Sequence, residues 1–135
     1  MKINLNVNYF TQKFIIKRTE SLLNKDLLNN NNELNNKIYG KSVLVIGGAG
    51  TIGSSYIKAL LKFKPVKLVV VDINENGLTE LVRDLRSSTF YNIPLSFITY
   101  PIDFGNKIFD KIYKTHGPFQ IVANFAAHKH VRSEK

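Results

Sequence analysis

A glycine-rich loop holds the residues of this chain best suited to binding chemistry. It lies between an apolar run at 43–46 and an amphipathic stretch at 56–61, and it reads Gly47-Gly48-Ala49-Gly50-Thr51-Ile52-Gly53. Glycines at this spacing let backbone N–H groups approach a pyrophosphate, because a Cβ would obstruct the approach and a helix N-terminus favours an anion. The loop therefore predicts a dinucleotide site.

An acidic residue follows the loop at the separation that such a site requires. Asp72 lies 72 − 53 = 19 residues after Gly53 and ends the next apolar run, where a carboxylate can accept hydrogen bonds from an adenosine ribose. Ile73 and Asn74 stand where an arginine would receive the 2′-phosphate of NADP. The sequence therefore favours NAD, although a basic residue elsewhere would permit NADP. A structural turn with a helix-capping aspartate is the alternative interpretation.

Two more candidate sites follow later predicted strands. Asp103, with the backbone of Phe104, either faces an adenine or caps the next helix, and spacing alone does not decide between them. Small residues near position 126 would let a ligand lie across the sheet edge. His128 and His130 lack a third ligand, so we expect no metal site.

Strand and helix patterns alternate from residue 41 onward. Continuous apolar runs predict buried strands, and apolar residues at i, i+3, i+4 and i+7 predict helices that pack on them. We expect strands at 42–46, 66–71, 95–100 and 119–125, and helices at 52–63, 74–86 and 104–115. This alternation requires right-handed crossovers between parallel strands. The predicted fold class is α/β, a Rossmann-like parallel sheet with helices on both faces, truncated after about four strands.

The first forty residues follow a different pattern. Residues 1–18 alternate weakly between apolar and polar, which suits a short strand or an arm that docks on another surface. Residues 19–37 hold leucines at helical spacing and predict one helix or two short helical turns, which asparagines should break or fray before Gly40. We therefore expect an N-terminal arm with a helical lead-in at 1–40, and the N-terminal part of an NAD(P)-binding domain at 41–135.

The composition is that of a globular chain with excess positive charge. The 135 residues are 44% hydrophobic and 21% charged, and the formal net charge is +9. The lysines are scattered, with no run of five basic residues, so we attribute the charge to solvated faces and expect no nucleic-acid partner. The chain has no cysteine and no stretch suited to a signal peptide or membrane span, which agrees with a cytoplasmic protein.

These motifs together resemble the extended short-chain dehydrogenase/reductases. The stretch Ala126-Ala127-His128-Lys129-His130-Val131 is similar to that of the nucleotide-sugar 4,6-dehydratases of polysaccharide biosynthesis, and the resemblance covers about residues 20–135. It implies an enzyme, dehydratase or epimerase, that uses NAD(P) and a UDP-linked sugar. In that family the catalytic Tyr/Met-x-x-x-Lys pair lies further downstream, so we expect this chain to be a fragment with no catalytic residue and no dehydratase activity alone.

The resemblance also implies roles for individual residues. Those implied for the cofactor are Gly47, Ala49, Gly50, Thr51, Ile52 and Gly53 around the pyrophosphate, Asp72, Ile73 and Asn74 at the ribose, Asp103 and Phe104 at the adenine, and Phe125 and Ala126 along the cofactor. Lys129 would reach toward the sugar nucleotide. The sequence departs from the family pattern at Ile46, where threonine is usual, and at Asn124-Phe125, where His-Ala is usual.

Two functions of other classes stay open. The first is a non-catalytic dinucleotide-binding module, such as a redox sensor or an assembly domain. The second is a basic domain that binds polyanions, for which strongly salt-dependent binding would be diagnostic. A homo-oligomer is also compatible with the sequence, because the apolar arm and an unpaired strand edge both need partners.

Overall fold

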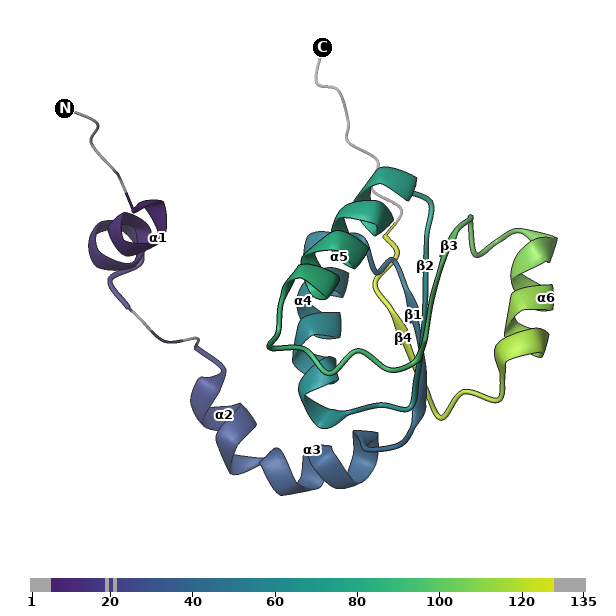
Figure 1. The fold of residues 1–135 in the computed structure, drawn as a ribbon, viewed down its shortest axis with the longest axis horizontal. Coiled ribbons are helices and arrows are strands. Elements are labelled where there is room, and N and C mark those ends of the chain that lie inside the picture. The colour runs from purple at the N-terminus through teal and green to yellow at the C-terminus, as the bar shows by residue number, and fades with distance from the viewer. Residues whose placement is uncertain (1–5, 19, 21, 128–135) are drawn as a thin grey trace, which may run out of the picture. The chain divides into compact units, whose positions relative to one another are not determined.

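A computed structural model describes residues 6–18, 20 and 22–127 of the chain. The chain divides into two compact units, Met1–Glu33 and Leu34–Lys135. The second unit contains a parallel sheet with helices against it, and the first is helical (Figure 1).

The sheet has four described strands in the order β3-β2-β1-β4, all parallel: β1 (Ser42–Ile46), β2 (Lys67–Asp72), β3 (Ser96–Pro101) and β4 (Ile121–Asn124). β1 is central, and its Leu44 pairs with Val69 of β2 and Val122 of β4. The chain moves outward from β1 to β3 and then returns to the other side of β1. This reversal is a topological switch point, where open α/β sheets bind ligands beyond the carboxyl ends of their strands.

Helices cover both faces of the sheet, which confirms the predicted fold class. They are α4 (Thr51–Leu60), continued by the 3₁₀ turn η2 (Leu61–Phe63), then α5 (Glu75–Ser87) and α6 (Lys107–His116). α4 and α5 pack on one face and α6 on the other (Figure 1).

Successive strand residues point into two separate apolar clusters. The cluster under α4 and α5 contains Val43, Val45, Ile57, Leu60, Leu61, Leu68, Val70, Leu78, Leu81 and Leu85. The cluster under α6 contains Leu44, Ile46, Val69, Val71 and Ile112. Because both faces of β1 and β2 are covered, these strands have continuous apolar sequences instead of alternating ones.

Asparagine side chains set the starts of two helices. Asn74 caps α5 and Asn106 caps α6, each accepting a hydrogen bond of 2.9 Å from a backbone N–H in the first turn. The predicted start of the last helix at Phe104 is therefore wrong by three residues. Asp103 does not cap this helix, because Asn106 occupies the capping position.

The segment before the sheet is helical where it is described. Its elements are α1 (Val7–Phe10), the π-helical turn η1 (Thr11–Ile15), α2 (Asn24–Asn29) and α3 (Asn31–Ile38). The predicted short strand within residues 1–18 is wrong for the described part. Phe10 and Phe14 stand four residues apart with ring centroids separated by 5.1 Å, and this helical contact outweighs the weak alternation.

The sequence predicts one helix or two short helical turns at residues 19–37, and the structure has the second alternative, as α2 and α3. The break falls at Asn30, whereas the asparagines at 35 and 36 remain within α3, so fraying is less extensive than predicted. Within the described part of the chain, every helix is too short or too polar to cross a membrane.

A leucine substitution tests the packing of α5 on the sheet. Leu85 is fully buried, so Leu85→Ala should lower the free energy of unfolding by about 2–5 kcal/mol, because it removes buried carbon atoms and leaves a cavity. Urea denaturation followed by circular dichroism measures this change. Leu95→Ala is the matched control, since Leu95 is exposed and its truncation should change stability by less than about 0.5 kcal/mol. Equal losses in the two variants would contradict the packing described.

Candidate functional site

A pocket of about 500 Å³ lies at the carboxyl ends of the strands. Its lining comes from the last residues of β1 and β2 and from the loops after all four strands: Ile46, Gly47, Gly50, Val71, Asp72, Ile73, Ile102, Asp103, Phe104, Phe125, Ala126 and Ala127. The parallel arrangement thus brings residues distant in the sequence to one cavity at the switch point.

The packing of the chain leaves no room for a Cβ at three glycines of the loop, Gly47, Gly48 and Gly53. At Gly48 a Cβ would overlap the side chain of the buried Val70. Gly47 has φ +75°, and a Cβ on it would lie 2.5 Å from the backbone nitrogen of Ala126. Gly53 is buried in α4, and a Cβ there would overlap the carbonyl oxygen of Gly47. Any larger residue at Gly47 or Gly53 would push α4 or β4 away from the loop.

Gly50 differs from these three glycines. It is exposed, its φ of −70° is accessible to any residue, and a Cβ on it would meet only the carbonyl oxygen of Gly47, at 3.6 Å. The fold therefore does not demand glycine at this position. Because Gly50 lines the pocket, the missing side chain leaves space for a molecule that approaches the loop.

The start of α4 presents backbone N–H groups beside this space. Gly50 is its N-cap residue and offers no side-chain hydrogen bond, whereas α5 and α6 are capped by asparagines. The first N–H groups of a helix have no acceptor within it and carry partial positive charge. The backbone N–H groups of this turn, together with the exposed hydroxyl of Thr51, are the donors that it offers to an anion.

Asp72 has a structural contact that sequence reasoning missed. Its Oδ2 accepts a hydrogen bond from the N–H of Ala49 at 2.9 Å, and its Oδ1 accepts one from the N–H of Asn74 at 2.9 Å. The carboxylate therefore ties the glycine loop to the end of β2. It also lines the pocket, and each oxygen retains a further lone pair that can accept a hydrogen bond.

Residues after β2 and β3 form a rim that is mostly apolar. Ile73 is 76% exposed and Phe104 is 44% exposed, and the Phe104 ring stands edge-on to that of Phe109, with centroids 6.5 Å apart. Oδ1 of Asp103 accepts a hydrogen bond from the N–H of Gly105 at 2.9 Å. This rim combines two apolar side chains with one carboxylate.

The segment after β4 is fixed against β1. Phe125 donates its N–H to the carbonyl of Ile46 at 2.8 Å. The centroid of its ring lies 5.0 Å from the centroid of the Tyr56 ring. Asn124 accepts a hydrogen bond from the N–H of Ala126 at 2.9 Å. Burial raises the pKa of the Tyr56 hydroxyl, which favours its neutral form.

The structure gathers many of the predicted site residues into this pocket. Those that line it are Gly47, Gly50, Asp72, Ile73, Asp103, Phe104, Phe125 and Ala126. Others shape the loop or the adjoining helix starts without lining the pocket: Ala49, Thr51, Ile52, Gly53 and Asn74. His128, Lys129 and His130 lie outside the described residues. The roles of all these residues in binding stay predictions.

The predicted binding residues did not include four residues of the lining: Ile46, Val71, Ile102 and Ala127. Ile46 and Val71 lie next to predicted site residues at strand ends, and Ile102 directly precedes Asp103. Their position at the carboxyl ends of predicted parallel strands is the signal that could have identified them.

Comparison with known proteins shows which family the chain is similar to. The family model described as "Polysaccharide biosynthesis protein" matches residues 43–134. "Probable polysaccharide biosynthesis protein EpsC" of Bacillus subtilis is 29% identical over 118 residues, 86% of this chain and 19% of that protein. "Capsular polysaccharide biosynthesis protein CapD" of Staphylococcus aureus is 30% identical over 100 residues, 73% of this chain and 16% of that protein.

A third relative matches over a shorter stretch. "Uncharacterized membrane protein MJ1061" of Methanocaldococcus jannaschii is 46% identical over 55 residues, 41% of this chain and 16% of that protein. The chain therefore spans less than a fifth of the length of each of these three relatives.

Solved structures share the arrangement of strands and helices. Pen from Bacillus thuringiensis has a TM-score of 0.57 and 28% identity, over 70% of this chain and 28% of Pen. The structure of gox2181 has a TM-score of 0.52 and 20% identity, over 68% of this chain and 35% of that chain, and shows likeness in fold alone. These similarities agree with the Rossmann-like sheet described above.

Alanine substitutions separate the glycines that the fold requires from Gly50. Gly53→Ala should lower the free energy of unfolding by about 1–3 kcal/mol, because its Cβ would overlap the Gly47 carbonyl. Gly50→Ala should change it by less than about 1 kcal/mol, the scale of a changed N-cap. Urea denaturation of both variants measures the difference. A loss at Gly50 equal to that at Gly53 would contradict the geometry of the loop.

Proposed function

The chain belongs to the polysaccharide biosynthesis protein family, and from this premise we propose that its pocket binds a nicotinamide dinucleotide. The observation that carries the proposal is the glycine at position 50. The fold does not require it, yet a side chain there would occupy space in the pocket. The start of α4 has no side-chain cap, and Gly50 adds no side chain in front of its backbone N–H groups, so a pyrophosphate can bind there.

The other pocket residues fit the remaining parts of such a ligand. The carboxylate of Asp72 has acceptor capacity left for the hydroxyls of an adenosine ribose. Ile73 and Phe104 offer apolar surface for an adenine, and Asp103 lies beside them in the lining. The volume of about 500 Å³ is within the range of small-molecule sites. NAD fits better than NADP, because Asp72 would repel a 2′-phosphate.

The described residues bind and orient the cofactor in this proposal. When bound, the nicotinamide would accept a hydride from a sugar carbon and return it, which is chemistry that the cofactor supplies. The titratable groups of the described lining are two aspartates, Asp72 and Asp103, and both are assigned to binding. We assign no catalytic residue to this part of the protein.

The whole protein would act on a nucleotide sugar, UDP-linked, as a 4,6-dehydratase or epimerase. Membership of the family and the printed descriptions of EpsC and CapD support a place in polysaccharide biosynthesis. In this proposal Lys129 reaches toward the sugar nucleotide. The groups that abstract and return protons would come from regions that EpsC and CapD have and that this chain does not cover.

A serine at position 50 separates binding from stability. Gly50→Ser adds a hydroxyl that accepts hydrogen bonds from the first turn of α4, so stability should be unchanged or slightly higher. The same hydroxyl would compete with the pyrophosphate for these backbone N–H groups. The affinity for NAD⁺ should therefore fall by about tenfold or more, the loss expected for one hydrogen bond to a charged group. Calorimetric titration measures the affinity, and the urea midpoint is the control. Unchanged NAD⁺ affinity in the serine variant would refute the proposed cradle.

The choice between NAD and NADP tests the role of Asp72. Asp72→Asn removes the negative charge and keeps one acceptor oxygen, so the ratio of NAD⁺ to NADP⁺ affinity should fall by about tenfold. Parallel titrations with the two cofactors give this ratio. If Asp72 only shaped the loop through its hydrogen bond to Ala49, the substitution would weaken the affinities for NAD⁺ and NADP⁺ equally. An unchanged ratio would therefore contradict the ribose contact.

A further inference from the structure

The helical segment α1–η1 (Val7–Ile15) exposes large apolar side chains. We define its apolar patch as Val7, Phe10, Phe14 and Ile15, which are 62%, 44%, 56% and 65% exposed. The rings of Phe10 and Phe14 contact each other at 5.1 Å between centroids. The two rings therefore form one exposed apolar surface, and Val7 and Ile15 are exposed on the same short segment.

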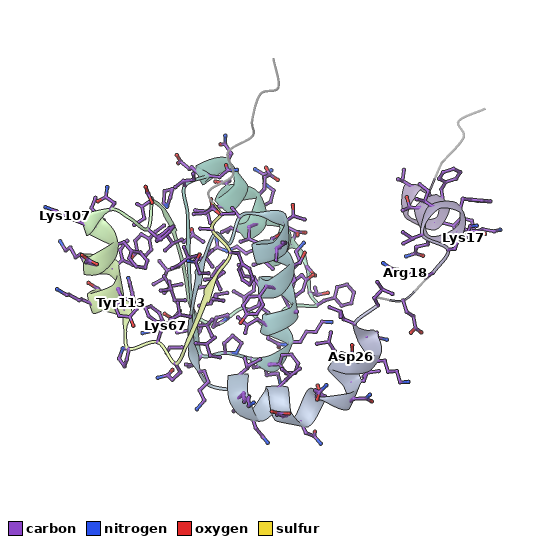
Figure 2. The ribbon with its side chains drawn as sticks, turned by 180° about the vertical axis from the view of Figure 1, so that it is seen from behind. Lys17, Arg18, Asp26, Lys67, Lys107 and Tyr113 are labelled. Atoms are coloured by element: carbon purple, nitrogen blue, oxygen red, sulfur yellow. The ribbon has the colours of Figure 1, made fainter. Side chains whose placement is uncertain are left out.

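Basic side chains border this patch. A groove of about 520 Å³ is lined by Tyr9, Gln12, Lys13, Lys17 and Arg18. The ammonium of Lys13 donates to the hydroxyl of Tyr9 at 2.9 Å and lies 5.5 Å from the centre of the Phe14 ring, so cation and apolar patch adjoin. Lys17 and Arg18 follow directly after this segment along the chain (Figure 2).

The sequence around this segment is uniformly basic. Residues 1–19 contain three lysines and one arginine and no aspartate or glutamate. A cationic groove next to exposed aromatic and aliphatic groups calls for a partner with negative charge directly beside apolar material. An anionic bilayer has this arrangement, because its phosphates lie above the acyl boundary.

We propose that the α1–η1 segment binds the surface of an anionic phospholipid membrane. Phe10, Phe14 and Ile15 insert at the acyl boundary, while Lys13, Lys17 and Arg18 contact lipid phosphates from the groove. The segment lies in the plane of the interface, since its length is far below the roughly 20 residues needed to span a bilayer.

Bilayer binding accounts for both the apolar patch and the basic groove. A nucleic acid would pair with the cations and leave the aliphatic side chains in water. This inference is independent of the cofactor proposed for the pocket, because it uses none of the pocket residues.

Flotation of the whole 135-residue chain with vesicles tests the proposal. Vesicles of phosphatidylcholine containing about 30 mol% phosphatidylglycerol should bind it at least about tenfold more tightly than pure phosphatidylcholine, and added salt should weaken this binding. Equal binding to the two compositions, or binding to neither, would overturn the proposal. Binding to a single-stranded oligonucleotide with no binding to anionic vesicles would also overturn it.

Charge reversals show whether this segment or the net charge is responsible. The triple variant Lys13→Glu, Lys17→Glu, Arg18→Glu should bind anionic vesicles roughly a hundredfold more weakly, since each basic residue near the surface contributes about fivefold. The matched control is Lys62→Glu, Lys111→Glu, Lys114→Glu, which changes the net charge equally at exposed positions and should keep most of the affinity. Similar losses in the two triples would overturn the assignment to α1–η1.

A further variant tests the contribution of the apolar patch without changing the net charge. Phe10→Ser with Phe14→Ser should weaken binding by about tenfold or more, because two aromatic rings no longer leave water. The urea midpoint of the sheet unit should stay unchanged in this variant, and it serves as the check of folding. Full retention of binding would show that charge alone is sufficient and would overturn insertion at the acyl boundary.

Discussion

The close fit of the glycine loop between β1 and α4 is the constraint on which the rest of the site depends. Gly47 lies against the backbone of Ala126, and Gly53 lies against the carbonyl of Gly47, so neither position has room for a Cβ. The carboxylate of Asp72 holds the loop from the side of β2 through the N–H of Ala49. Because three parts of the chain fix the loop, the start of α4 is directed to the pocket at the switch point.

This fit divides the glycine motif by physical role. A motif of this kind is easily mistaken for a simple tight turn, and three of the four glycines in the loop do serve the packing of this fold. Gly50 has ordinary backbone angles and free space around its missing side chain, so packing gives no reason for it. The ligand hypothesis therefore rests on the one glycine that the fold leaves unexplained, which is stronger support than the spacing of the motif.

The sheet could be predicted well, because burial on two faces leaves a clear sequence pattern. The predicted bounds of β1 agree with the structure at both ends, and the other strands differ by a few residues. Contacts between distant residues were beyond prediction: Asp72 and Ala49 are 23 positions apart, and their hydrogen bond depends on the packed sheet. The short strand considered for residues 1–18 is wrong in the described part, because the apolar alternation there is weak, while the contact of Phe10 with Phe14 follows helical spacing.

The most direct test of the dinucleotide site is an NMR titration of the ¹⁵N-labelled chain with NAD⁺. The account predicts saturable shifts that are largest at the backbone amides of Gly50, Thr51 and Ile52, where the pyrophosphate would lie, with further shifts near Asp103. Amides in the middle of α6, on the sheet face away from α4, should shift little. Absence of saturable shifts, or shifts centred away from the start of α4, would contradict the claim that this pocket is the cofactor site.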